Sequence, residues 1–187
     1  MNRRTLLLGG SAFALVGASP RRRYLKEHRG FTRELVLYFD IATALILRAT
    51  LLEPAFRAVV ADERRRLMDP SAEDHAAFVA RMQADGAAFF DVVFAADSAF
   101  DNATKFGPGD DRWNLRLEAD GAEQPFVQVD RVRRPSPLHE ALYAQTNQWS
   151  ELWIARWQRL VPAPGTVVLH VGGGFGNGDC VWQGLRG

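Results

Sequence analysis

Three tryptophans near the C-terminal end of the chain have the residue type and spacing best suited to binding chemistry. Trp149, Trp153 and Trp157 recur at every fourth position, so they fall on one face of either a strand or a helix. Aromatic content and the strand-like segments on both sides favour a strand over 149–160. On an exposed strand, rings about 13 Å apart would stack on sugar rings or hold an extended peptide. In a buried strand the same rings would fill the core, and the sequence leaves both roles open.

Catalytic patterns are missing around the other reactive side chains. No serine lies in a Gly-x-Ser-x-Gly motif, and the single cysteine, Cys180, has no histidine close to it in the sequence. Metal-ligand spacing is absent from the four histidines, which are His28, His75, His139 and His170. We therefore expect no catalytic residue, no metal site and no cofactor, and we favour a protein that is not an enzyme. A hydrolase whose Asp, Glu and His residues come together from distant positions remains the alternative.

Two loops carry residues that bind ligands in other settings. The run Gly172-Gly173-Gly174-Phe175-Gly176-Asn177-Gly178 has the composition of a phosphate loop, but no lysine and no room for a helix follow it. It predicts a hairpin connection. The segment 97–111 offers hard oxygen ligands but lacks the spacing of a calcium loop, so we expect a solvated loop. Those oxygen-bearing residues are Asp97, Asp101, Asn102, Asp110 and Asp111.

Alternation of apolar and polar residues predicts a mainly β fold that would position these side chains. It is clearest at 113–118, where Trp113, Leu115 and Leu117 share one face. Strand-like segments lie at 35–40, 43–52, 87–96, 113–118, 124–133, 149–160, 166–171 and 179–183. Because short turns join most of them, we predict an antiparallel β-sandwich of immunoglobulin-like type with seven or eight strands.

A two-helix insertion over residues 54–85 interrupts the strands. Its first helix begins at Pro54, since proline suits the first helical turn, and its second helix is expected to end at Gly86. We expect the pair to pack at one end of the sandwich or across an edge. A short helical turn is expected within 138–144.

The hairpin after the clearest strand contains an inconsistency. Asp120-Gly121 predicts a tight two-residue turn, which would place Gln128 opposite Trp113. One extra residue would instead place Val129 there. We therefore predict a bulge or a longer loop near Pro125, which has no N–H to donate to a strand ladder.

The first 18 residues have the three parts of a secretory signal peptide. A cationic start precedes an apolar run, and small residues lead to a cleavage site expected after Ala18. The string Arg3-Arg4-Thr5-Leu6-Leu7 resembles a twin-arginine signal, so we expect Arg3 and Arg4 to direct export. The protein is then expected in the bacterial periplasm or outside the cell.

Basic side chains concentrate before residue 30. The chain has a net charge of +1, whereas its part beyond residue 29 carries −5. We interpret residues 19–33 as a basic neck before a single domain, 34–187. Nucleic acid is excluded as the main partner, because phosphate binding needs a positive face on the fold itself. A weak contact with anionic lipid is expected through four residues of the neck, Arg21, Arg22, Arg23 and Lys26.

The composition is that of an ordinary globular protein. The chain has 187 residues, of which 47% are hydrophobic and 24% charged, which excludes disorder, collagen and coiled coil for the whole chain. We expect an exported, non-catalytic β-sandwich protein of the cell envelope that binds a protein partner or supports an assembly. The alternative is a glycan-binding module that uses the tryptophan face.

Overall fold

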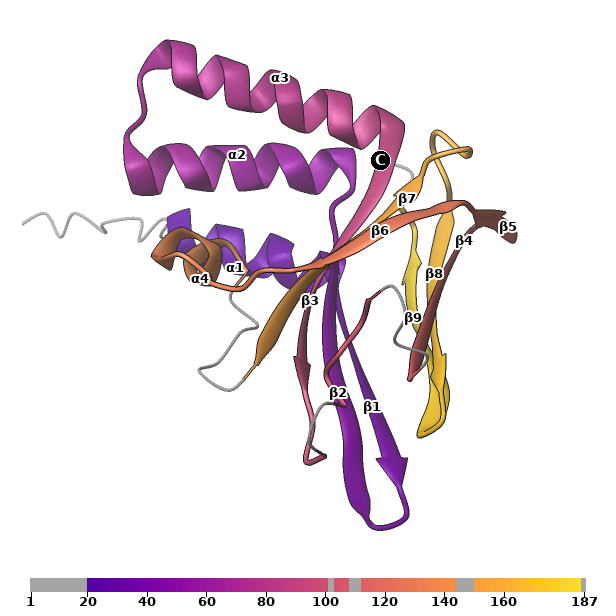
Figure 1. Ribbon diagram of the computed structural model, residues 1–187. Helices are drawn as coiled ribbons and strands as arrows, with labels where there is room; N and C mark the ends of the chain where they lie inside the picture. Colours follow the sequence, from indigo (N-terminus) through magenta and orange to yellow (C-terminus); the bar gives the residue numbers. More distant parts are fainter. Residues whose placement is uncertain (1–19, 101–102, 108–111, 144–149, 186–187) are drawn as a thin grey trace, which may run out of the picture.

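Two antiparallel sheets form the body of the protein, which we describe from a computed structural model over residues 20–100, 103–107, 112–143 and 150–185. One sheet has five strands in the order β1-β2-β3-β7-β6, and the other has four in the order β5-β4-β8-β9 (Figure 1). The mainly β, sandwich-like fold expected from the alternating segments is confirmed. The strands are β1 (Thr32–Phe39), β2 (Ala42–Leu51), β3 (Phe89–Asp97), β4 (Trp113–Ala119), β5 (Ala122–Gln124), β6 (Phe126–Arg131), β7 (Glu151–Gln158), β8 (Thr166–Gly173) and β9 (Gly176–Gln183).

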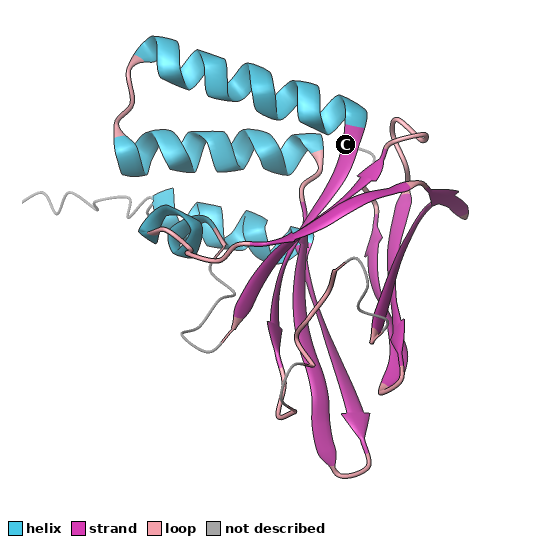
Figure 2. Ribbon diagram, in the orientation of Figure 1, coloured by secondary structure: helices cyan, strands magenta, loops and turns pink. Residues whose placement is uncertain are grey.

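Helices pack on one end of the outer face of the five-stranded sheet, and β1, β2 and β3 extend beyond them (Figure 2). The helices are α1 (Pro20–Phe31), α2 (Pro54–Met68), α3 (Ala72–Ala88) and α4 (Pro137–Leu142). The expected insertion and the expected helical turn are both present as helices. The pair α2 and α3 lies on the helical side of the sheet, and α2 packs between α3 and α1 (Figure 1).

Two of these helices differ from the sequence-based expectation. The segment expected as a basic neck is helix α1, and its Tyr24 and His28 are buried against the sheet and α2. Helix α3 continues past Gly86 to Ala88, since Gly86 is a packing position rather than an end. A Cβ there would lie 2.9 Å from Arg57 Cδ. Within the described residues, no helix is long and apolar enough to cross a membrane.

Alternation along each strand divides the apolar residues between two cores. The inter-sheet core contains the tryptophan face of β7 together with Phe90, Val92 and Phe94 of β3. The opposite faces of the same strands contribute Val93 and Leu152 to the core beneath the helices. Both faces of the central strands are therefore covered, as the near-continuous apolar run of β3 predicts.

The inconsistency near Pro125 is resolved by a strand that changes sheets. Asp120 and Gly121 both have positive φ, 47° and 81°, which confirms the tight turn. Pairing of β4 with β5 stops at Gln124, and beyond Pro125 the chain joins β7 in the other sheet as β6. The expected pairing of Val129 with Trp113 is therefore wrong, although the irregularity was placed correctly. The break also raises the strand count from eight to nine.

This change of sheet leaves one side of the sandwich open. Among the described residues, the first half of β4 has no strand partner on the side of β5, because β5 pairs only with residues 117–119. The opposite side is closed, since β1 packs on β9 and Arg33 Nε donates to the carbonyl of Val181 at 2.7 Å. A cavity therefore reaches the surface between β4 and β6.

Candidate functional site

The cavity between the sheets is the best candidate for a binding site. It has a volume of about 330 Å³, and its wall combines four polar side chains, Asn114, Arg116, Glu123 and Gln124, with apolar side chains from β4, β6 and β7. Those apolar side chains are Trp113, Leu115, Phe126, Val129 and Trp157, with Phe106 from the loop before β4. Cavities of this size with mostly apolar walls and a few polar groups are typical of small-molecule sites.

The two described tryptophans of β7 differ from Trp113 and Trp182 in their hydrogen bonds. Trp113 Nε1 donates to the carbonyl of Ala103, and Trp182 Nε1 donates to the carbonyl of Phe31 at 2.8 Å. By contrast, the buried Nε1 atoms of Trp153 and Trp157 have no acceptor in the described part of the chain. Buried donors are paired in the great majority of cases, so two exceptions on one strand call for an explanation.

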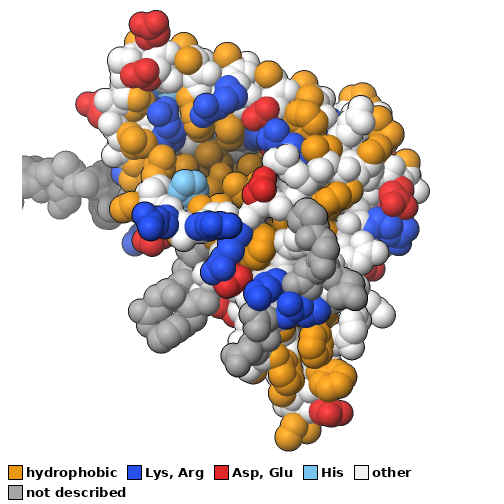
Figure 3. Space-filling view, viewed as in Figure 1, with side chains coloured by type: hydrophobic (Ala, Val, Ile, Leu, Met, Phe, Trp, Pro, Cys, Tyr) orange, Lys and Arg blue, Asp and Glu red, His pale blue; other side chains and the backbone are white. Residues whose placement is uncertain are grey.

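A second hollow adjoins the first and shares Phe106, Gly107 and Val129 with it. It is lined by Trp153 and by four charged residues, and its volume is about 460 Å³. The charged residues are Lys105, Asp130, Arg131 and Arg133. Basic side chains are also visible on this face of the molecule, between apolar ones (Figure 3). The second hollow therefore combines an aromatic side chain with an excess of positive charge.

The structure places two of the three predicted tryptophans in the wall of this site. Trp153 and Trp157 lie on strand β7, as predicted, and they are 7% and 0% exposed. They belong to the inter-sheet core and do not form an open aromatic surface. Trp149 lies outside the described residues, as do the two arginines of the expected export signal, Arg3 and Arg4.

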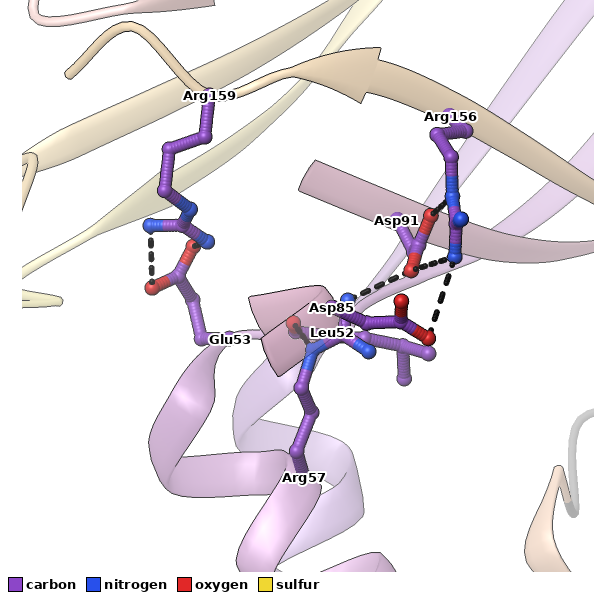
Figure 4. Close-up of polar contacts among 7 residues, drawn as sticks. All are labelled: Leu52, Glu53, Arg57, Asp85, Asp91, Arg156 and Arg159. Atoms are coloured by element: carbon purple, nitrogen blue, oxygen red, sulfur yellow. Dashed lines mark hydrogen bonds and ion pairs between the residues drawn. The ribbon is translucent and has the colours of Figure 1, made fainter. Parts of the chain in front are cut away.

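A buried charge cluster lies on the other face of the same sheet, beneath the helices (Figure 4). Asp91 of β3, only 2% exposed, accepts from Arg57 Nη2 at 2.7 Å and from Arg156 Nε at 2.6 Å. Arg156 also approaches Asp85 of α3 at 3.6 Å. Arg57 donates further to the carbonyl of Leu52 at 2.8 Å. One carboxylate thus connects α2 with two neighbouring strands.

A second buried ion pair continues this junction. Arg159 Nη2 donates to Glu53 Oε1 at 2.9 Å, and its guanidinium lies 3.8 Å from the centre of the Phe90 ring. Tyr143 is buried close to the Asp91 cluster, and burial raises its pKa to about 12. Each acid here is held by a guanidinium, so neither Asp91 nor Glu53 is available as a general base. We interpret the cluster as a structural connection between helices and sheet.

The histidines do not assemble into a site among the described residues. His139 caps α4, where its Nδ1 accepts from the backbone N–H of Ser136 at 3.2 Å. His170 lies on the outer face of the second sheet, with Nδ1 2.8 Å from Asp179 Oδ1 and Nε2 3.5 Å from Glu118 Oε1. His28 is buried beside Phe56. His75 belongs to α3.

Cys180 is buried in the inter-sheet core and is a free thiol. Burial, with a smaller contribution from the negative charge of Asp179, raises its pKa to about 12. A thiol with this pKa is almost entirely protonated at neutral pH, so Cys180 is unsuited to nucleophilic chemistry.

The two loops singled out in the sequence have different outcomes. The glycine run forms the end of the β8–β9 hairpin, where Gly173 pairs with Gly176, so the expected hairpin connection is confirmed. Strand β3 ends at Asp97, which forms an ion pair with Arg48 at 2.9 Å. The other oxygen-bearing residues of that loop, Asp101, Asn102, Asp110 and Asp111, lie outside the described residues. Over the ranges described, no group of three His, Cys, Asp or Glu side chains is arranged to hold a metal ion.

Comparison with known proteins adds no family to this description. Neither the protein-family models nor the curated proteins contain a match to the chain.

Sequence reasoning missed most of the cavity wall. Lys105 and Phe106 lie in a loop without periodicity, so nothing in the sequence placed them beside the tryptophans. The inward alternation of Trp113 and Leu115 was a usable signal, because it placed both side chains between the sheets. The alternation does not indicate that β6 would pair with β7 and not with β4.

Proposed function

We propose that this protein is a non-catalytic binding protein that holds a small apolar molecule between its two sheets. The observation that carries the proposal is the cavity of about 330 Å³ between the sheets, whose wall includes the apolar side chains of Trp113, Leu115 and Trp157. A bound apolar molecule would remove the accessible part of this wall from water.

Export to the cell envelope is part of the proposal and rests on the leader. The paired arginines and the short apolar run of residues 1–18 support it. The double substitution Arg3→Lys with Arg4→Lys should retain the protein in the cytoplasm, measured by cell fractionation. Unchanged export would contradict the twin-arginine route.

Binding is tested by calorimetric titration of residues 19–187 with 1-decanol, a neutral apolar probe, below its solubility limit. We expect saturable binding and a rise in melting temperature, since a ligand bound only to the folded state stabilises it by mass action. Leu115→Trp, which fills the cavity, should abolish binding. Val181→Trp adds an indole to the exposed face of β9 and should bind normally. Equal binding by the two variants would refute the cavity as the site.

Glycan binding receives no support from the two described tryptophans, because their rings are buried. Titration with soluble glycans should leave the tryptophan fluorescence unchanged. A saturable quench would instead favour the glycan-binding alternative.

A further inference from the structure

Building on the proposed function, we propose that the ligand is an apolar monocarboxylate. Its carboxylate would lie at Lys105 and Arg133, and its apolar part would lie between the sheets along Phe106, Val129 and Trp157.

The first step concerns charge at the opening that contains Trp153. Of the cations there, Arg131 is neutralised by Glu151 at 2.7 Å. The acid, Asp130, accepts from Gln128 Nε2 at 2.9 Å. Lys105 and Arg133 line the same opening, and neither forms an ion pair with a described acid. The Gln128 amide leaves the negative charge of Asp130 in place, so the described side chains of this opening keep a net excess of one positive charge.

The second step fixes the orientation of the ligand. At the other side of the cavity the only lining cation, Arg116, lies 2.9 Å from Glu118 and 3.6 Å from Glu123. That side is electrically compensated, so it gives an anion no advantage. The charged end of a ligand should therefore lie at Lys105 and Arg133, and its apolar end deeper in the cavity.

The third step concerns the head group. Trp153 lines the charged opening, whereas its indole nitrogen is buried, so the donors that a head group can reach there are Lys105 and Arg133. A carboxylate has two oxygens and about four acceptor positions, which suits the two charged donors. Phe106 and Val129 line both hollows, so the head-group position lies next to the apolar wall of the sandwich.

The test compares decanoate with 1-decanol at pH 7.5 by calorimetry, below the concentrations at which decanoate forms micelles. We expect decanoate to bind on the order of tenfold more tightly. Lys105→Gln with Arg133→Gln should remove that advantage and leave 1-decanol binding unchanged. The matched control, Arg65→Gln with Arg134→Gln, removes the same charge from exposed residues that do not line either hollow. It should retain the preference for decanoate.

Added NaCl gives a second readout, because screening weakens the contribution of exposed charges. Decanoate affinity should fall with salt in the wild type and not in the Lys105/Arg133 variant. If both probes bind equally, or if the variant keeps its preference for decanoate, the monocarboxylate proposal is overturned while the cavity remains a binding site. If neither probe binds, the proposed function fails together with it.

Discussion

Replacing Asp91 tests whether the buried charge cluster stabilises the packing of the helices on the sheet. The carboxylate of Asp91 accepts from two guanidinium groups, those of Arg57 and Arg156. In Asp91→Ala, Arg57 would stay charged in a site where it is 2% exposed, with the carbonyl of Leu52 as its remaining recorded partner. Arg156 is 26% exposed at its side chain and would turn to Asp85 or to water.

The expected loss of folding stability comes from the buried guanidinium of Arg57, which cannot reach solvent. Breaking a buried pair by removing one partner costs about 3–5 kcal/mol. In a domain of this size, each kcal/mol lowers the melting temperature by about 2–4 °C, so we expect a fall of roughly 6–20 °C. Calorimetry and urea unfolding of residues 19–187 would measure it.

Two further variants decide whether the charge is the cause. Glu34→Ala removes the acid of an exposed pair with Arg48, at 2.8 Å, and should cost less than about 1 kcal/mol. Asp91→Leu with Arg57→Met removes both buried charges and should recover most of the loss, since an apolar pair needs no desolvated partner. A loss below 1 kcal/mol in Asp91→Ala, or no recovery in the double variant, would refute the reasoning.

Three other predictions concern single sites elsewhere in the fold. Gly173→Ala should lower the free energy of unfolding by about 3 kcal/mol in urea, because its Cβ would lie 1.8 Å from the carbonyl oxygen of Arg112. The control Gly30→Ala, at an open helix position, should be neutral or stabilising. Similar free energies for the two variants would contradict this prediction. Cys180 should react with a thiol reagent only after unfolding, because burial raises its pKa to about 12, and fast labelling of the folded protein would be inconsistent with a buried thiol. Hydrogen bonds from arginines lower the pKa of Glu63, so its contribution to stability is complete above its ordinary value of 4.5 and is lost as the pH falls through the lowered pKa. The stability difference between the wild type and Glu63→Gln should therefore shrink below pH 4.5, and a difference that grows there would reverse the sign.

The sequence by itself determined the local elements of this protein. Alternation predicted the strands, Pro54 marked the first helix, and Asp120-Gly121 fixed a tight turn, because side-chain period and backbone φ are properties of neighbouring residues. The same period placed Trp153 and Trp157 on one face of one strand.

Only the tertiary structure decided what covers each face. Periodicity states which side chains point the same way, but it does not state which sheet or helix lies opposite them. The chain changes sheets at Pro125, and this opens the cavity beside Trp157, which a local pattern has no means of encoding. Likewise, Asp91 and Arg57 lie 34 residues apart and meet only because α2 packs over β3, so their burial follows from packing and not from spacing.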